Sequence, residues 1–257
     1  MNLKTQGLIL KKIKLNENDA LFTILTRDMQ KLTAMSKGIR SLKHKDFAAL
    51  QPFCYSELEL SGKAGFYYVS SAQVVSNFYN LRTAVEKVSF ATYFAQVAGN
   101  LADYTQGDAE YFRFLLNTFY FLENAEKNAS GSGVFLECRR LKVLFELRSA
   151  AAAGFGPQTQ ACVHCGKASD LGWFDIENGG AVCGGCKQDH LRPISLEALK
   201  IMHLFCYAPM KDAFYLAVKR PEVVEQMEQI SEPFLSSKLE YYFQSLDYLK
   251  QVAYPSE

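Results

Sequence analysis

Four of the seven cysteines form two CxxC pairs, and this pattern restricts the fold more than any other feature of the chain. A tetrahedral zinc site takes four ligands, with thiolate sulfurs about 2.3 Å from the ion. Two CxxC turns joined by roughly 15–20 residues can close such a site, and here residues 166–182 join them. We therefore predict one structural Zn²⁺ per chain, held by Cys162, Cys165, Cys183 and Cys186.

Two other uses of these cysteines stay open. They could be reduced buried thiols or redox pairs, although a thioredoxin-like CxxC follows a strand in a βαβ unit, which the sequence pattern lacks. His164 and His190 lie near the pairs, but four thiolates already fill a tetrahedral site, so we expect both histidines to be bystanders. Cys54, Cys138 and Cys206 make the cysteine count odd, which argues against a disulfide framework.

The composition is that of a globular protein. Of the 257 residues, 49% are hydrophobic and 21% are charged, so a sizeable core can be buried in one large domain or two modest ones. No run approaches the roughly 20 apolar residues that a membrane span needs. The apolar stretch at Leu8–Leu10 is too short for a secretory signal. We therefore expect a cytoplasmic protein that makes no membrane contact.

Positive charge is concentrated near the N-terminus. Residues 1–50 carry a net charge of +6 and the remainder carries −5, which gives +1 for the whole chain. The segment Lys37–Lys45 reads KGIRSLKHK, a basic loop that can follow a phosphate backbone. We therefore predict binding of nucleic acid by this region. The expected DNA-binding residues are Lys37, Arg40, Lys43 and Lys45, supported by Lys11, Lys12 and Arg27, with Lys14 and Lys31 extending the patch.

Three consecutive aromatic residues, Phe66, Tyr67 and Tyr68, have two possible roles. Their rings could stack unpaired bases, because every base offers a π face. They could instead fill the core of a β domain, which is the more frequent role of such residues. The sequence leaves both roles open.

The first 75 or so residues are typical of β structure. Strands are predicted near residues 8–14 and at 20–26, 31–36, 53–60 and 66–75. Five short strands in this length match a small closed barrel, and the OB-fold is the commonest such barrel. An SH3-like barrel also fits the pattern.

After Asn77 the apolar residues recur at helical spacing. Helices are predicted up to about residue 101, over 108–123 and 134–152, after an N-cap at Ser195 and from about Ser231 onward, with an exposed loop over 124–133. We therefore expect an α+β multidomain fold. An OB-fold DNA-binding domain spans residues 1–78, and a helical domain spans 79–257 and carries the zinc-binding insertion at 158–192.

Motifs of the common catalytic sites are missing from the sequence. It contains no phosphate-binding loop, dinucleotide-binding fingerprint, HExxH motif or nucleophile elbow. We therefore expect a binding protein rather than an enzyme. The two main classes of function are a nucleic-acid-binding protein and a zinc-containing protein-interaction adaptor whose DNA contact is incidental. A third, a zinc-dependent enzyme, would need an open coordination position and a nearby carboxylate.

The whole chain resembles the bacterial RecO family of DNA repair and recombination mediators. The resemblance is carried by Gly7–Leu10, Asp19–Thr26, Lys37–Arg40, Leu50–Phe53, Phe145–Gly154 and the two CxxC pairs, in this order. It implies an N-terminal OB-fold, a helical domain and a zinc-binding insertion.

The resemblance also implies a function and partners. RecO-like proteins bind single- and double-stranded DNA, anneal complementary strands and help to load RecA together with RecR, without nucleotide hydrolysis. They also engage the C-terminal tail of single-stranded DNA-binding protein. The basic helix around Arg139, Arg140 and Lys142 is the expected site for that acidic tail. The implied location is the bacterial cytoplasm, in association with the nucleoid.

Overall fold

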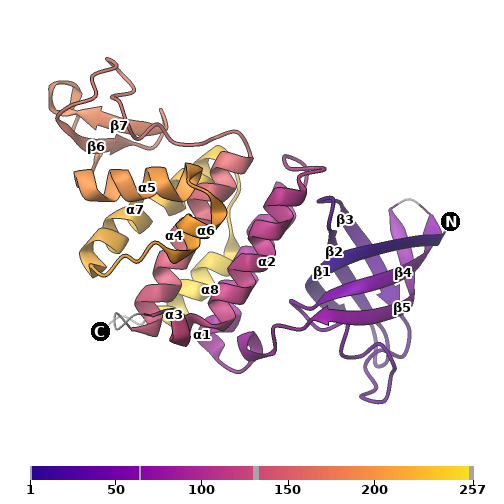
Figure 1. Ribbon diagram of the computed structural model, residues 1–257. Helices are drawn as coiled ribbons and strands as arrows, with labels where there is room; N and C mark the ends of the chain where they lie inside the picture. Colours follow the sequence, from indigo (N-terminus) through magenta and orange to yellow (C-terminus); the bar gives the residue numbers. More distant parts are fainter. Residues whose placement is uncertain (1, 64, 130–132, 255–257) are drawn as a thin grey trace. The chain divides into compact units, whose positions relative to one another are not determined.

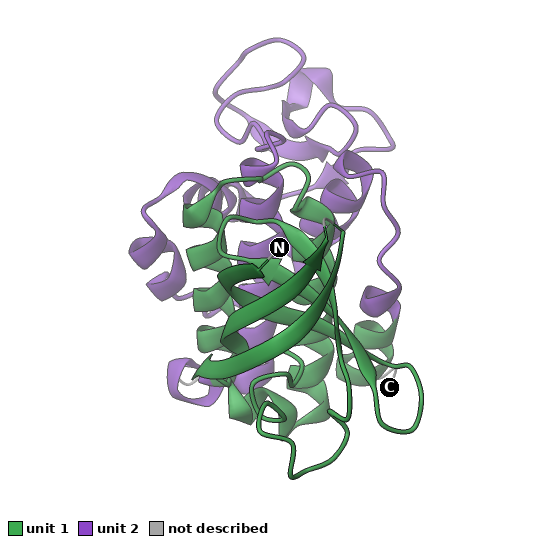
Figure 2. Cartoon of the chain, turned by 90° about the vertical axis from the view of Figure 1, so that its right-hand side faces the viewer, with its two compact units in different colours: residues 1–123, 248–256 green, residues 124–247, 257 purple. Residues whose placement is uncertain are grey.

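The computed structural model describes residues 2–63, 65–129 and 133–254 (Figure 1). The chain forms two compact units. Unit 1 comprises residues 1–123 and 248–256, and unit 2 comprises residues 124–247 and 257 (Figure 2). The basic N-terminal region belongs to unit 1 and the cysteine pairs belong to unit 2, so each candidate site is built within a separate unit.

Unit 1 contains a closed five-stranded barrel in the order β1-β2-β3-β5-β4. Its strands are β1 (Asn2–Lys14), β2 (Ala20–Thr26), β3 (Lys31–Ser36), β4 (Tyr55–Lys63) and β5 (Phe66–Ser76). β3 and β5 pair in parallel, whereas all the other neighbours pair antiparallel. This order is that of an OB-fold, so the predicted fold class is confirmed.

Alternation along the strands fills the barrel. In β4, Ser56, Leu58 and Leu60 are buried, while Glu57 and Glu59 between them are exposed. This is the period of two that a strand imposes when one face meets a core. Leu58 and Leu60 join a cluster that also contains Ile9, Ala20, Phe22, Ile24, Ala34, Ile39, Ala49, Leu50, Cys54, Tyr67 and Ala72.

Gly7 of β1 lies where the barrel wall leaves no space for a side chain. A Cβ atom at Gly7 would lie 2.6 Å from Cγ2 of Ile24 and 3.1 Å from the carbonyl oxygen of Leu25. Ile24 is β-branched and fully buried, so its methyl group has little freedom to move away. We expect Gly7→Ala to lower the free energy of unfolding, measured in urea, by about 1–3 kcal/mol.

The control for this substitution is Gly172→Ala. An added Cβ at Gly172 meets no atom within 4 Å, so the free energy of unfolding should stay unchanged. Equal stability of Gly7→Ala and wild type would show that the barrel wall can relax around an added methyl group.

Buried contacts tie the segment between β3 and β4 to the barrel. Ile39 and Leu50 from this segment are fully buried in the barrel core. Asp46 is 4% exposed, and its Oδ1 accepts a hydrogen bond of 3.1 Å from the backbone N–H of Ala72 in β5. The segment that carries the basic loop is therefore built onto the barrel.

Unit 1 also contains η1 (Tyr79–Arg82), α1 (Val85–Leu101) and α2 (Ala109–Glu123). Asp108 caps α2 as predicted, because its Oδ1 accepts from the N–H groups of Glu110 and Tyr111 at 2.9 and 2.8 Å. α1 lies against part of the barrel, where Nζ of Lys31 donates to the carbonyl oxygen of Gly99 at 3.1 Å.

Unit 2 combines helices with a small three-stranded sheet. Its elements are α3 (Ala125–Asn128), α4 (Val134–Ala152), β6 (Leu171–Asp175), β7 (Gly180–Cys183), η2 (Gly184–Cys186), β8 (Arg192–Pro193), α5 (Leu196–Tyr207), α6 (Met210–Tyr215) and α7 (Pro221–Lys238). α4 has the predicted bounds, and Ser195 caps α5 by accepting from the N–H of Ala198 at 3.2 Å. The predicted loop over 124–133 instead contains α3, and residues 130–132 lie outside the described part.

The prediction for the last helix is wrong. α7 begins at Pro221, ten residues before Ser231, and Pro233 lies inside it. Proline fits the first turn of a helix, and Pro221 occupies that position here. The chain then leaves the helical conformation, with a positive φ of 48° at Glu240, before α8 (Gln244–Ala253) begins.

No helix in the described ranges combines the length and the apolar character that a membrane crossing requires.

Candidate metal centre and nucleic-acid interface

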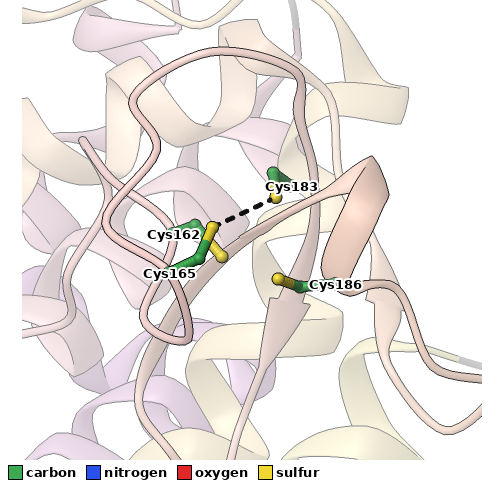
Figure 3. A group of neighbouring side chains, drawn as sticks. All are labelled: Cys162, Cys165, Cys183 and Cys186. Carbon is green, nitrogen blue, oxygen red and sulfur yellow. Dashed lines mark hydrogen bonds between the residues drawn. The ribbon is translucent and has the colours of Figure 1, made fainter.

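The small sheet of unit 2 brings the two CxxC pairs together. Cys183 ends β7 and pairs with Leu171 at the start of β6, while Cys186 ends the short helix η2. Cys162 and Cys165 lie on the turn before β6. A hydrogen bond of 2.9 Å from the N–H of Val163 to the carbonyl oxygen of Ala181 holds this turn to β7. As Figure 3 shows, the four cysteine side chains gather in one place.

The spacing of the sulfurs fits a tetrahedral ion. All four Sγ atoms lie within 4.8 Å of one another, and those of Cys165 and Cys183 are 3.6 Å apart. Bonds of about 2.3 Å in a tetrahedron place neighbouring sulfurs about 3.8 Å apart. All four are free cysteines. The donor set therefore fits a closed Zn²⁺ site.

The local backbone favours negative charge on this cluster. Burial raises the pKa of the Cys162 thiol, but N–H groups of Cys183, His164 and Cys165 outweigh it, and the pKa falls to about 6. Contacts with Cys165 and Cys183 raise the pKa of Cys186 to about 12. Sulfurs this close resist full deprotonation unless a cation balances them, and a divalent metal ion would supply that charge.

The nearby histidines are not part of this cluster. Nε2 of His164 lies 3.1 Å from Oδ2 of Asp175, and that carboxylate also accepts from Asn178. His190 is exposed. Within the described residues, the group with metal-ligand spacing consists of cysteines alone.

Several of the predicted basic residues converge on one end of the barrel. Lys12, Lys14 and Arg40 line a depression of about 320 Å³ together with Ala20 and Phe47. Nζ of Lys12 lies 5.1 Å from the centre of the Phe47 ring. Burial lowers the pKa of Lys12, and the positive charge of Arg40 lowers it further. The clustered positive charges make this depression, the basic mouth, a candidate site for an anion.

The predicted residues of the basic loop differ in their contacts. Nη1 of Arg40 donates to the carbonyl oxygens of Asn16 and Glu17 at 3.0 and 2.6 Å. Nζ of Lys45 donates to the carbonyl oxygen of Ser70 at 3.4 Å. These bonds hold both cations against the barrel.

Lys37 and Lys43 of the same loop are exposed. Neither forms a salt bridge within the part of the chain that the structure describes. They belong to the same loop as Arg40, which lines the basic mouth.

The structure separates other residues of the predicted patch. Lys11 pairs with Thr23 and Lys12 with Phe22, so the two lysines lie on opposite faces of β1. Lys14, at the position i+2 from Lys12, lines the mouth, although it was predicted only to extend the patch. Period-two alternation is the signal that distinguishes these positions.

Arg27 is not brought to the mouth. It follows β2 at the end away from Ala20, and a strand of seven residues spans about 20 Å. Arg27 instead lines a different depression, of about 650 Å³, together with Lys4, Glu57, Glu59 and others. That depression therefore carries both positive and negative charges.

The expected tail-binding cations have carboxylate partners inside unit 2. Arg140 is 2% exposed and donates to both carboxylate oxygens of Glu137 at 2.8 and 2.7 Å. Lys142 is 1% exposed and lies 2.9 Å from Glu146. Their positions favour a structural role.

Arg139 is also paired within unit 2. Its Nη2 lies 2.6 Å from Oε2 of Glu228, which α7 supplies. Arg139 and Lys142 therefore join α4 to α7.

The fold and the cysteine cluster define an OB-fold protein with a helical region and a candidate structural metal module. Family models described as Recombination protein O N terminal and Recombination protein O C terminal match residues 1–78 and 82–247. The chain therefore belongs to the recombination protein O (RecO) family of DNA repair proteins, and the predicted family is confirmed.

Individual relatives are similar along nearly their whole length. The chain is 25% identical over 251 residues to DNA repair protein RecO of Acetivibrio thermocellus, with 96% of each chain covered. It is 28% identical over 240 residues to DNA repair protein RecO of Alkaliphilus metalliredigens, covering 93% of this chain and 89% of that one. For DNA repair protein RecO of Caldicellulosiruptor saccharolyticus, the identity is 30% over 211 residues, with 81% and 82% covered.

Proposed function

We propose that this protein binds single- and double-stranded DNA at the basic mouth of its barrel and anneals complementary strands. The observation that carries this proposal is the convergence of Lys12, Lys14 and Arg40 on one depression. Lys37 and Lys43, on the same loop as Arg40, are exposed. Phosphates bound there would displace condensed counterions, which is the main source of affinity for a polyanion.

The same electrostatics explains annealing. Two DNA strands repel each other through their phosphates, and a basic surface that contacts both lowers this repulsion. Pairing then releases its own free energy, so the proposed step needs no nucleotide hydrolysis. In this proposal the protein acts as a recombination mediator that helps to load RecA together with RecR.

We further propose that the four cysteines hold one structural Zn²⁺. The core beneath them consists of Cys162, Val182, Cys183 and Leu191, with partly buried neighbours such as Trp173. A core this small is insufficient to stabilise a fold by itself, so a metal ion would supply the missing free energy.

We also propose the C-terminal tail of single-stranded DNA-binding protein as a partner, because membership of the RecO family implies it. Because Arg140 and Lys142 are buried among carboxylates, we do not place the tail on them.

The test of DNA binding is the triple substitution Lys14→Glu, Lys37→Glu and Lys43→Glu. These lysines are exposed, so the fold should survive. If three phosphate contacts are lost, the slope of log K against log salt for a single strand should become shallower by about 2. We expect affinity for single strands and duplexes to fall at least tenfold in a salt series.

The matched control changes charge by the same amount in unit 2, through Lys200→Glu, Lys211→Glu and Lys219→Glu, all exposed positions. It should retain most of the affinity. Equal losses in the two triple variants would show a general charge effect. DNA retention by the mouth variant at the wild-type level would contradict the proposal and favour the adaptor.

A further inference from the structure

The outer surface of the barrel carries a row of exposed and half-buried apolar side chains. In register, Ile13 of β1 pairs with Leu21 of β2, Leu21 pairs with Met35 of β3, and Met35 pairs with Tyr68 of β5. Phe66 lies two residues before Tyr68 and therefore on the same face of β5. We call these five residues the aromatic face.

The two rings of this face are displayed to solvent. Phe66 and Tyr68 are 42% and 45% exposed, whereas Tyr67 between them is 8% exposed and belongs to the core. The exposed rings lie edge to face, with centroids 5.6 Å apart. Neighbouring exposed apolar side chains mark an interaction surface more often than isolated ones do. Tyr67 therefore fills the core, whereas the rings of Phe66 and Tyr68 are accessible to a ligand.

Positive charges flank the aromatic face. Lys63 of β4 pairs with Phe66, and Lys11 pairs with Thr23 on the outer side of β2. Lys45 reaches the carbonyl oxygen of Ser70, two residues beyond Tyr68. Exposed aromatic rings surrounded by lysines complement a polymeric ligand whose own aromatic rings are linked by anionic groups.

We propose that Phe66 and Tyr68 stack unpaired bases, so that the aromatic face selects single-stranded nucleic acid. The inference rests on the proposed DNA binding and assigns it a substrate preference. A single strand can turn its bases onto protein rings, whereas a duplex keeps its bases stacked inside and offers its phosphates alone. The basic mouth contacts either form, and the aromatic face adds affinity for the unpaired one.

The test compares a 20-nucleotide oligothymidine with a duplex of equal length, using the full chain with Phe66→Ala and Tyr68→Ala. Base stacking on an aromatic side chain contributes about 1–3 kcal/mol per base, so single-strand affinity should fall about 10- to 100-fold. Duplex affinity should stay within twofold. Thermal melting confirms folding, which these exposed side chains should leave intact.

Two further variants sharpen the test. Phe66→Tyr with Tyr68→Phe keeps both rings and should keep single-strand affinity. Tyr79→Ala with Tyr104→Ala removes two exposed rings elsewhere in unit 1 and should have no effect on binding.

Tyr68→Trp provides a direct signal. The chain's one tryptophan, Trp173, lies in unit 2. The added indole should therefore be quenched by oligothymidine and much less by duplex.

The outcomes separate this inference from the function beneath it. Wild-type affinity of the ring-deleted protein for oligothymidine would overturn the stacking role and leave the face to a protein partner. An equal loss on single strands and duplex would overturn the preference. If wild-type protein shows no salt-dependent DNA binding, the proposed function itself fails.

Discussion

Cys165→Ser will lower the melting temperature of unit 2, although the position is exposed, and will lose the Zn²⁺ that we propose for the cysteine cluster. Surface substitutions that touch no special feature usually change stability by about 0.5 kcal/mol or less, and serine is nearly isosteric with cysteine. If Cys165 is a zinc ligand, the same change removes one of the four metal–sulfur bonds. The free energy of unfolding should then fall by close to about 4 kcal/mol.

Cys206→Ser is the matched control. Cys206 is a buried thiol in the same unit, outside the cysteine cluster. Burial raises the pKa of Cys206 to about 12, so its sulfur stays protonated and is not poised as a ligand. This variant should lose some packing energy but keep its zinc.

Metal content and thermal melting are measured on the same samples. DNA affinity of the remaining folded fraction should change less than stability does. Full zinc occupancy in Cys165→Ser, or a larger effect on DNA binding than on melting, would contradict a structural Cys₄ site.

Lys142→Met will lower the free energy of unfolding by about 3–5 kcal/mol, because it leaves buried carboxylates without their cation. Lys142 lies 2.9 Å from Glu146 on its own helix and 3.2 Å from Glu232 on α7. Burial lowers the pKa of Lys142, but the carboxylates of Glu146, Glu228 and Glu232 outweigh it and raise the pKa above its ordinary value. Urea denaturation measures the loss.

The defect should depend on pH. Burial raises the pKa of Glu146, and Lys142 partly opposes this shift. Without Lys142 the folded pKa rises further above the ordinary value of about 4.3. A carboxyl group whose pKa is higher in the folded than in the unfolded state stabilises the fold at pH values below its unfolded-state pKa. That contribution is lost as the pH rises through its folded-state pKa. The variant should therefore be closest to wild type in acid and weaken as pH increases.

Two comparisons identify the cause. Lys142→Met combined with Glu146→Gln should recover part of the loss, because the buried charge is also removed. Arg220→Met breaks two ion pairs, but they are exposed, so its melting temperature should match that of wild type. A loss of stability in Lys142→Met that is the same at all pH values would indicate a packing defect instead.

Local patterns made most of the barrel predictable. β2 and β3 have their predicted bounds, because the first segment is rich in β-forming residues and the second alternates. The cysteine spacing likewise predicted a cluster, since two CxxC turns can converge only if the chain between them folds back. These features depend on near neighbours in sequence.

Features that depend on distant partners were not predictable. Arg140 and Lys142 look like solvent-exposed cations in sequence, but Glu232 of α7, ninety residues from Lys142, helps to bury the lysine. The start of α7 lies earlier than predicted, because Pro221 occupies the first turn and the helix continues through Pro233. The gathering of Lys12, Lys14 and Arg40 required the barrel itself, because strand and loop meet only in three dimensions.

The bond from Ala72 to Asp46 and the burial of Ile39 and Leu50 have a thermodynamic consequence for recognition. A tethered loop has already lost its conformational entropy during folding, so little further ordering accompanies ligand capture. A polyanion then meets a preorganised array of charges. Association should be set by the frequency of encounter, and its rate should fall steeply as ionic strength increases.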